Sequence, residues 1–295
     1  MNSETIIDVR NLKQHFYINK NFTIKAVDDV SFQVNKGEIF GLVGETGSGK
    51  STIARTIMGI YPITSGEVYF KGNMISDKNI YNQNKKDIQK NMQIIFQDSA
   101  AALNPRMTVE RIIAEPLQVN HIINSKEELQ KKIDELMSVV GLDISYKSKY
   151  PGEISGGQRQ RVAIARSIGM KPDLIIADEP IASLDVSIQA QIVTLFQRLQ
   201  KEYGFTFIFI AHDLSIIRFI SDRVGVMFRG KLMEVAPTKE LFKKPVHPYT
   251  QALLSAVPVP DPVYERNKKI LTYDEENIKS ESKMVEVSPG HFVYS

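Results

Sequence analysis

The chain has 295 residues, a formal net charge of +3 and no cysteine or tryptophan, and 42% of its residues are hydrophobic. The absence of cysteine excludes a disulfide-stabilised secreted fold, cysteine-ligated zinc and an iron–sulfur cluster. The nearly balanced charge is not that of a protein that coats nucleic acid, which usually carries a strongly basic surface. The sequence has no run of about 20 apolar residues that could form a membrane helix, and its start, MNSETIIDVR, does not resemble a signal peptide. We therefore expect a cytoplasmic chain that reaches a membrane only through partners.

The first part of the chain predicts β-strands, then a buried strand, a loop and a helix. Apolar residues alternate up to residue 34 and end at a turn. Residues 38–43 form an apolar run that is too short for a helix and is typical of a buried strand. Residues 52–58 have a helical pattern that Gly59 stops. Residues 76–91 are rich in Lys and Asn with little periodicity, so we expect a solvated loop there.

Two amphipathic helices are predicted further along the chain. The first begins after Ser125, which is expected to form a capping box with Glu128, and it ends at Gly141. The second runs from about 187 to 203.

The second helix lies between two apolar runs, residues 174–177 and 205–210. Strand, helix and strand in this order predict a parallel sheet covered by helices, so the expected fold class is α/β. Residues 261–295 contain no long periodic element, and we expect them to form an appendage that wraps around the domain or frays.

A glycine-rich segment directly after the first buried strand matches the phosphate-loop pattern. The predicted nucleotide-binding residues there are Gly44, Glu45, Thr46, Gly47, Ser48, Gly49, Lys50, Ser51 and Thr52. Glycines let successive backbone N–H groups point at phosphates, and the start of the helix adds partial positive charge. Lys50 is expected to bridge phosphate oxygens and Ser51 to ligate Mg²⁺. The alternative is a flexible Gly/Ser loop, which the strand before it and the helix after it argue against.

Two carboxylates, Asp178 and Glu179, follow the apolar run at residues 174–177. The carboxyl ends of parallel strands face the ligand crevice, where a phosphate loop also lies. Because adjacent residues on a strand point opposite ways, Asp178 is predicted to hold Mg²⁺ and Glu179 to polarise the attacking water. The alternative is a pair of acids that cap an exposed strand end.

The segment ISGGQ at residues 154–158, followed by RQRVAIAR, resembles the signature of ATP-binding cassette (ABC) proteins. Other family motifs follow in order: Gln97 resembles the Q-loop residue, Asp185 belongs to a D-loop, and His212 resembles the switch histidine. Phe16, with Tyr17 as substitute, occupies the place of the aromatic residue that stacks on adenine. The resemblance implies the P-loop NTPase fold of ABC ATPases. That fold has a RecA-like core, an antiparallel β subdomain and a helical subdomain, here at about 85–165.

The signature residues are expected to form a second phosphate site. Ser155 can cap the helix that follows, and Gly156 and Gly157 leave backbone N–H groups uncovered beside Gln158. In the family this site faces the ATP of the opposing subunit, so two subunits share two nucleotides. The alternative is a plain helix cap.

The resemblance also assigns roles to two polar side chains. His212 follows a strand next to the one that carries Asp178 and is expected to contact the γ-phosphate. Gln97 is expected to ligate Mg²⁺ or water while ATP is bound and to release it afterwards.

Three segments resemble the ATPase subunits of oligopeptide and dipeptide importers. They are QIIFQDSAAALNPRMTV, DEPIASLDVSIQAQ and HPYTQALLSAVP, the last at residues 247–258. The ending KMVEVSPGHFVYS resembles the tail of the second ATPase subunit of such importers. The expected domains are thus an ATPase domain at 1–260 and a C-terminal extension at 261–295.

This resemblance implies hydrolysis of ATP with Mg²⁺ to drive oligopeptide import, at the cytoplasmic face of the membrane. The implied partners are a second ATPase subunit, in a heterodimer, two permease subunits, and an extracellular peptide-binding protein that acts indirectly; no nucleic acid is expected. The surface of the helical subdomain would receive a short permease helix. Two alternatives stay open: uptake of dipeptides, nickel or another small solute, and a soluble ABC ATPase that acts on nucleic acid or ribosomes.

Overall fold

The computed structural model describes residues 4–20, 22–258, 268–274 and 283–295. The chain divides into two compact units, one within residues 1–80 and 208–295 and the other within residues 81–207. Two elements continue across the division, helix α2 (Lys78–Asn91) and strand β8 (Thr206–Ile210).

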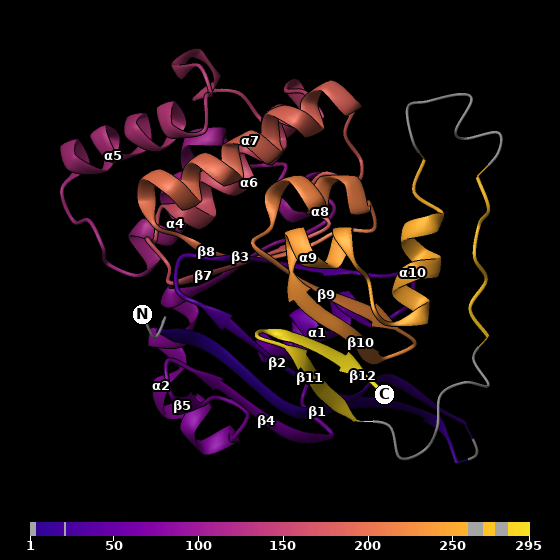
Figure 1. Cartoon of the computed structure of the whole chain (residues 1–295). Coiled ribbons are helices and arrows are strands. Elements are labelled where there is room, and N and C mark those ends of the chain that lie inside the picture. The colour runs from indigo at the N-terminus through magenta and orange to yellow at the C-terminus, as the bar shows by residue number, and fades with distance from the viewer. Residues whose placement is uncertain (1–3, 21, 259–267, 275–282) are drawn as a thin grey trace. The chain divides into compact units, whose positions relative to one another are not determined.

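The first unit contains a four-stranded antiparallel sheet in the order β2-β1-β4-β5 (Figure 1). Its strands are β1 (Thr5–Asn19), β2 (Phe22–Asn35), β4 (Ser65–Phe70) and β5 (Asn73–Met74). Apolar residues at alternating positions of these strands are buried; Val9 on β1 and its cross-strand partner Phe32 on β2 are an example. The strands predicted for the first 36 residues are therefore present.

A second group of strands in this unit has the order β11-β12-β10-β9-β3. The strands are β3 (Ile39–Val43), β9 (Arg223–Phe228), β10 (Lys231–Pro237), β11 (Met284–Ser288) and β12 (His291–Tyr294). β3 and β9 are parallel, whereas the other neighbours are antiparallel. Every residue of β3 is buried, as its uninterrupted apolar sequence predicts.

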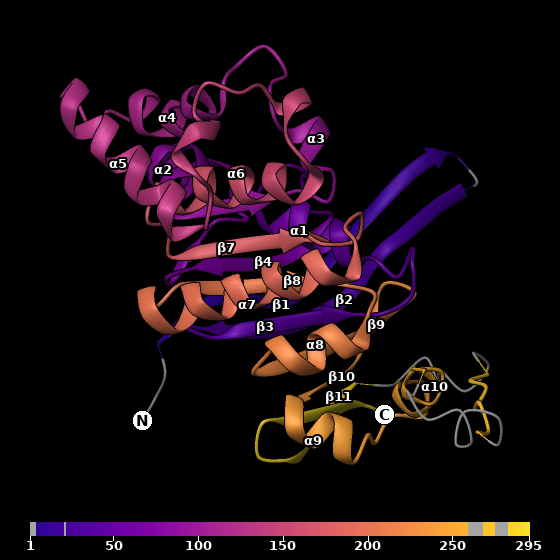
Figure 2. The ribbon, with the colours of Figure 1, turned by 90° about the horizontal axis from the view of Figure 1, so that it is seen from above.

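The helices described in this unit, which pack against strands of its two sheets, are α1 (Lys50–Ile57), α8 (Leu214–Ile220), α9 (Thr238–Lys243) and α10 (Pro248–Ser255). α1 contacts β1 and β2, α8 contacts β3, and α9 contacts β9 and β10. Figure 2 shows α8 beside β3 and α9 beside β10. α8 can approach β3 closely because Gly41 has no side chain; a Cβ there would lie 2.9 Å from Ile217 Cγ2.

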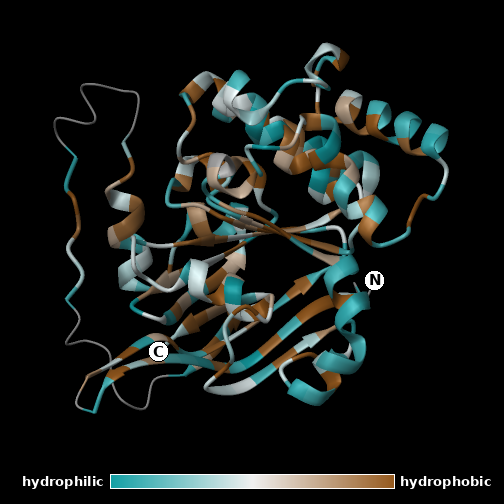
Figure 3. Ribbon diagram, turned by 180° about the vertical axis from the view of Figure 1, so that it is seen from behind, coloured by the Kyte–Doolittle hydropathy of each residue, from teal (hydrophilic) through white to brown (hydrophobic). Residues whose placement is uncertain are grey.

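In the second unit, β6 (Met92–Ile95) and β7 (Leu174–Asp178) pair in parallel. The helices there are α3 (Ser99–Ala102), α4 (Val109–Val119), α5 (Lys126–Val139), α6 (Gly156–Ile168) and α7 (Val186–Tyr203), with short 3₁₀ turns at Ile144–Tyr146 and Pro151–Glu153. Hydrophobic residues concentrate on the central strands and hydrophilic residues on the outer helix faces (Figure 3).

Both amphipathic helices predicted from the sequence are present. Ser125 Oγ accepts a hydrogen bond from the Glu128 backbone N–H at 3.4 Å and so begins α5. α7 ends at Gly204, whose φ of 70° is the left-handed conformation that glycine adopts easily. The order β7, α7, β8 is the strand, helix and strand that the sequence predicted.

The expected loop at residues 76–91 is wrong, because α2 covers Lys78–Asn91. Asp77 Oδ1 accepts from the backbone N–H groups of Asn79 and Ile80 and thereby stabilises the start of this helix. Only Ile88 of α2 is buried, so the sequence has no apolar stripe that could reveal a helix.

The C-terminal segment contains regular structure that the sequence did not predict. Residues Met284–Tyr294 form the hairpin β11–β12, and β12 pairs with β10. The other parts of the predicted appendage at 261–267 and 275–282 lie outside the described residues.

Candidate nucleotide-binding site

The phosphate loop connects β3 to α1 and encloses the amino group of Lys50. Lys50 Nζ donates to Gly44 O at 2.7 Å and to Glu45 O at 2.9 Å, and the residue is only 4% exposed. The loop therefore curls around its own ammonium group at the N-terminus of a helix. This arrangement suits a phosphate, since Lys50 and the N–H groups of the first helical turn are all donors.

Two glycines allow other parts of the backbone to approach this loop. A Cβ on Gly44, where φ is +147°, would lie 2.1 Å from Met227 O. A Cβ on Gly49, where φ is +103°, would lie 2.2 Å from Ala26 O. Any other residue at either position would clash with a carbonyl group, so these glycines fix the loop against β9 and β2.

The turn between β9 and β10 forms a backbone hydrogen bond with the phosphate loop. The Gly230 backbone N–H donates to Ser48 O at 2.9 Å, and Gly230 O accepts from the Asp28 N–H at 2.7 Å. The turn contains Arg229 and Gly230, with φ values of 44° and 81°. The loop is thus fixed on two sides by backbone contacts before any ligand binds.

His212 lies on the same side of this unit as the phosphate loop. The backbone N–H of Ala211 donates to Leu42 O at 3.3 Å, which ties the end of β8 to the strand that leads into the loop. His212 follows directly and is exposed. The structure therefore brings His212 and the phosphate loop to the carboxyl ends of neighbouring segments, as expected for a ligand crevice.

Phe16 lies on the β1–β2 hairpin and pairs with Ile24, two residues from the Ala26 carbonyl that contacts Gly49. Its ring packs edge-on against Tyr61 with centroids 5.3 Å apart. Tyr17 is 71% exposed, and adjacent strand residues point to opposite faces. Only one of the two rings can therefore face the loop side of the hairpin.

In the second unit, the acidic pair is split between a strand and a turn. Asp178 is the last residue of β7 and is 2% exposed. Glu179 has a φ of +48° and lies outside the strand. The prediction that the two side chains alternate along a strand is therefore wrong for Glu179, because the backbone turns into the left-handed region at this residue.

Gln97 follows β6 and is exposed. β6 and β7 are parallel neighbours, and Ile95 lies opposite Ala177. Gln97 and Asp178 therefore both lie at the carboxyl ends of these two strands. The structure thus places Gln97 near the acidic strand end within this unit.

The signature segment begins α6 as predicted. Ser155 Oγ accepts from the Gln158 N–H at 3.3 Å, and Gln158 Oε1 accepts from the Ser155 N–H at 2.8 Å, which completes a capping box. A Cβ on Gly157 would lie 2.6 Å from Ile188 Cγ2, so this glycine is also needed for the close packing of α6 on α7. Asp185 is exposed at the N-cap position of α7.

The predicted site residues therefore form two groups. The phosphate loop at 44–52, Phe16 and His212 belong to the first unit. Gln97, Asp178, Glu179, Asp185 and the signature residues 155–158 belong to the second unit.

The described residues contain no group of three or more His, Cys, Asp or Glu side chains suited to a metal. Mg²⁺ at nucleotide sites usually takes one or two protein oxygens and completes its shell with phosphates and water. The Ser51 hydroxyl, in the first turn of α1 beside the loop, is of the chemical type that such a site requires.

The sequence did not single out two buried polar residues near the C-terminal part of the first unit. Tyr249 on α10 is 2% exposed. Burial raises the pKa of its hydroxyl, and the charge of the neighbouring Glu45 carboxylate raises it further. Glu234 on β10 is completely buried and holds the start of α10. Tyr249 lies within the HPYT segment, and the resemblance of that segment to peptide-importer ATPases is the sequence signal that could have drawn attention to this residue.

A sequence profile described as ABC transporter matches residues 27–182. The chain belongs to the ABC transporter family. A second profile, described as oligopeptide/dipeptide transporter, C-terminal region, matches residues 233–281. The segment that contains β10, α10 and Tyr249 is therefore characteristic of a subgroup within the family.

Curated relatives extend the similarity over almost the whole chain. The oligopeptide transport ATP-binding protein OppF of Bacillus subtilis (strain 168) is 51% identical, over 99% of this chain and 96% of the relative. The oligopeptide transport ATP-binding protein AmiF of Streptococcus pneumoniae serotype 4 is 48% identical, with the same coverage of both chains.

Solved structures of ABC cassettes have the same fold. A dimeric post-hydrolysis state of the ATP-binding cassette MJ0796, bound to ADP and Pi, has a TM-score of 0.71 and 28% identity, over 79% of this chain and 99% of that chain. CbiO1 from Clostridium perfringens, part of the transporter complex cbiONQ, has a TM-score of 0.72 and 28% identity, over 82% of this chain and 92% of that chain. These likenesses confirm the predicted ABC ATPase fold.

In the part of the chain that the structure describes, no helix is both long and apolar enough to span a membrane.

Proposed function

We propose that this chain is the ATP-hydrolysing subunit that energises an ABC importer for oligopeptides. The observation that carries the substrate class is the match of residues 233–281 to the C-terminal region of oligopeptide/dipeptide transporters. The likeness to oligopeptide transport ATP-binding proteins over 99% of the chain supports it. The preformed phosphate loop around Lys50 supplies the chemistry that nucleotide binding requires.

In this proposal the first unit binds the nucleotide. The N–H groups of residues 44–52 and the Lys50 ammonium hold the phosphates, and Phe16 or Tyr17 stacks on adenine. His212 contacts the γ-phosphate. Lys50 exchanges its loop carbonyls for phosphate oxygens, so little rearrangement is needed.

Hydrolysis is assigned to the carboxylates and the amide of the second unit. Glu179 orients and polarises the attacking water, and Gln97 responds to the presence of the γ-phosphate. Ser51, Gln97 and Asp178 would hold Mg²⁺, which neutralises phosphate charge when bound. The turn at Glu179 separates its side chain from the strand that ends at Asp178, so the two carboxylates can serve different tasks.

The capping box at the start of α6 presents backbone donors at a helix N-terminus. We propose that Ser155, Gly156, Gly157 and Gln158, together with Asp185, complete the nucleotide site of an opposing ATPase subunit. Two such subunits, either different or identical, would then act with two permease subunits at the cytoplasmic face of the membrane. A peptide-binding protein outside the cell would deliver the substrate to the permease.

Growth on defined peptides tests the substrate class. A strain that lacks this gene and requires one amino acid is supplied with it as an oligopeptide, as a dipeptide or in free form. We expect growth on free amino acid, and growth on the oligopeptide only when the wild-type gene is restored. The Glu179→Gln gene serves as a control for hydrolysis and should not restore growth.

The other outcomes are equally informative. Loss of growth on the dipeptide alone would assign the chain to dipeptide uptake. Normal growth of the deletion strain on every peptide, with a defect in nickel uptake instead, would contradict peptide import.

A further inference from the structure

The segment that begins α10 contains a buried hydroxyl group to which the proposed chemistry gives no role. Tyr249 is 2% exposed, and within the described part of the chain no hydrogen bond of normal geometry reaches its hydroxyl. A buried polar group without a partner lowers stability, so its presence in a core position calls for an explanation.

The Tyr249 hydroxyl lies beside Glu45, the second residue of the phosphate loop. Burial raises the pKa of Tyr249, and the negative charge of the Glu45 carboxylate raises it further, whereas the Glu45 backbone N–H acts in the opposite direction. The packing agrees with this proximity, because the Tyr249 ring lies 4.3 Å from that of Phe228, and the carbonyl of the preceding residue, Met227, lies against Gly44, the neighbour of Glu45. The groups that could satisfy this hydroxyl therefore belong to the loop.

Glu45 in turn controls the position of the Lys50 ammonium. Glu45 O accepts from Lys50 Nζ at 2.9 Å and from the Ser48 N–H at 3.1 Å. A rotation of the peptide group at Glu45 would therefore move the amino group that is expected to meet the phosphates. A side chain that fixes Glu45 also fixes Lys50.

Tyr249 is well placed to hold Glu45 because its own ring is immobilised. The ring lies 4.3 Å from that of Phe228 and 5.6 Å from that of Tyr273, measured between centroids. Phe228 directly follows Met227, whose carbonyl lies against Gly44. The aromatic cluster of Phe228, Tyr249 and Tyr273 thus supports the loop from β9.

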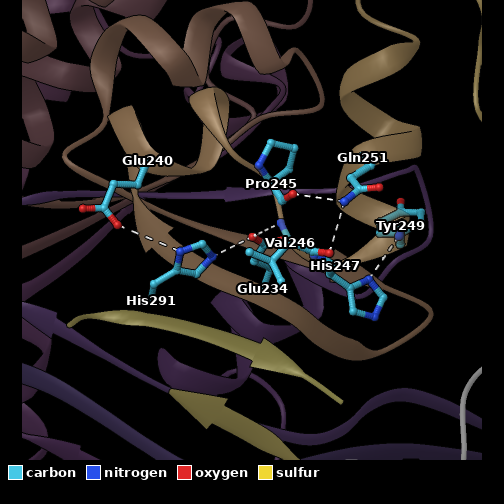
Figure 4. A network of polar contacts seen from close by, with 8 residues as sticks. All are labelled: Glu234, Glu240, Pro245, Val246, His247, Tyr249, Gln251 and His291. Carbon is cyan, nitrogen blue, oxygen red and sulfur yellow. Dashed lines mark hydrogen bonds and ion pairs between the residues drawn. The ribbon is translucent and has the colours of Figure 1, made fainter. Parts of the chain in front are cut away.

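The start of α10 is fixed as firmly as the ring. Glu234 accepts from the backbone N–H groups of Val246 at 2.9 Å and His247 at 3.0 Å (Figure 4). His247 Nδ1 accepts from the Tyr249 N–H at 3.1 Å, and Gln251 Nε2 donates to carbonyls of the same segment. Tyr249 is therefore held at both its backbone and its ring, and its hydroxyl lies beside Glu45.

We propose that Tyr249 is a positioning residue for the phosphate loop: its hydroxyl holds Glu45 in place when ATP binds, and so orients Lys50. This inference rests on the proposed function only in requiring that the loop binds ATP. It gives the C-terminal region of this subgroup a direct connection to the nucleotide.

Tyr249→Phe tests the inference because it removes the hydroxyl and keeps the ring. In the full chain, we expect this variant to bind a fluorescent ATP analogue about tenfold more weakly, as for the loss of a hydrogen bond to a charged group. Its melting temperature should stay close to that of the wild type, because the aromatic cluster is intact. Tyr294→Phe is the matched control: it loses the bond from Lys231 Nζ at 2.8 Å but should bind the analogue normally.

A double-mutant cycle with Glu45→Ala separates positioning from packing. If Tyr249 acts through Glu45, the effect of Tyr249→Phe on ATP affinity should shrink when Glu45 is already alanine. An equal effect in both backgrounds, or normal binding by Tyr249→Phe, would overturn the inference.

Lys50→Ala distinguishes this failure from failure of the proposed function. If the wild type binds the analogue and Lys50→Ala does not, while Tyr249→Phe binds normally, only the role of Tyr249 is refuted. If the wild type itself does not bind ATP, both the proposed ATPase function and the role of Tyr249 are refuted.

Discussion

Gly44 and Gly49 show how single backbone positions shape the phosphate loop. Each has a positive φ, and at each a Cβ would overlap a carbonyl oxygen of another strand. Left-handed backbone alone costs a non-glycine residue about 1–2 kcal/mol, and a clash with a carbonyl adds to this. The two contacts hold the loop in the conformation that phosphate binding requires.

Gly44→Ala should therefore destabilise the chain by about 3 kcal/mol, through strain and the contact with Met227 O, and should also abolish nucleotide binding. Urea unfolding and titration with an ATP analogue measure the two effects. Gly37→Ala is the control, because Gly37 also has a positive φ, of +74°, but no atom within 4 Å of its Cβ position. We expect about 1 kcal/mol for the control. Equal effects of the two substitutions would show that the contact with β9 is unimportant.

The sequence could identify the individual residues of the loop, because the spacing of Gly44, Gly49, Lys50 and Ser51 is a local pattern. It could not identify Tyr249 or Glu234 in the same way. Tyr249 lies beside Glu45 only after β10 and α10 have folded back, and no local spacing records that approach. Glu234 resembles a surface acid until its partners, up to 57 residues away, are known.

At the scale of elements, one carboxylate holds α10 and the C-terminal hairpin against β10. Glu234 is 0% exposed and accepts from the backbone of Val246 and His247, and its Oε1 lies 2.7 Å from His291 Nε2 on β12. A buried carboxylate is tolerated when hydrogen bonds replace its hydration. Glu234 thus joins elements that are far apart in the sequence.

Glu234→Ala should lower the free energy of unfolding by about 3 kcal/mol, because it leaves the backbone N–H groups of Val246 and His247, just before α10, and the ring of His291 without their partner. Glu240→Ala is the matched control: Glu240 lies 3.9 Å from the other nitrogen of the same histidine, but its side chain is 54% exposed. We expect a loss below about 1 kcal/mol there. Chemical denaturation compares the two, and similar losses would contradict the role of Glu234 as an anchor.

Elements with a clear period or cap were predicted from the sequence, and those without were not. α5 and α7 bury one face each, so their apolar residues repeat at helical spacing. α2 buries Ile88 alone, and its polar sequence resembles a loop. The hairpin β11–β12 had a Pro-Gly turn between alternating residues, but its pairing with β10 depends on the tertiary fold.

At the scale of the whole molecule, the proposed sites require a second ATPase subunit. The signature donors at the start of α6 and the phosphate loop are assigned to opposite sides of a shared nucleotide. Binding should therefore favour association, and hydrolysis should reverse it.

Glu179→Gln should bind ATP but fail to hydrolyse it, because binding needs no base whereas hydrolysis does. We expect this variant, mixed with its partner ATPase subunit, to form an ATP-dependent dimer that persists in size-exclusion chromatography with light scattering. The wild type should return to separate subunits as ATP is consumed. Lys50→Ala in the same mixture should not dimerise, and undiminished ATP turnover by Glu179→Gln would refute its assignment as the base.

The position of β12 beside β10 has a consequence for how this protein avoids self-association. Without the terminal hairpin, β10 would present unpaired N–H and C=O groups along an exposed sheet edge, which other chains could extend into aggregates. β12 pairs with that edge at Glu234 and Val235. The new outer strand, β11, is only five residues long, and short edge strands resist further pairing. The hairpin therefore shields the β10 edge from pairing with other chains, and this task is separate from nucleotide binding.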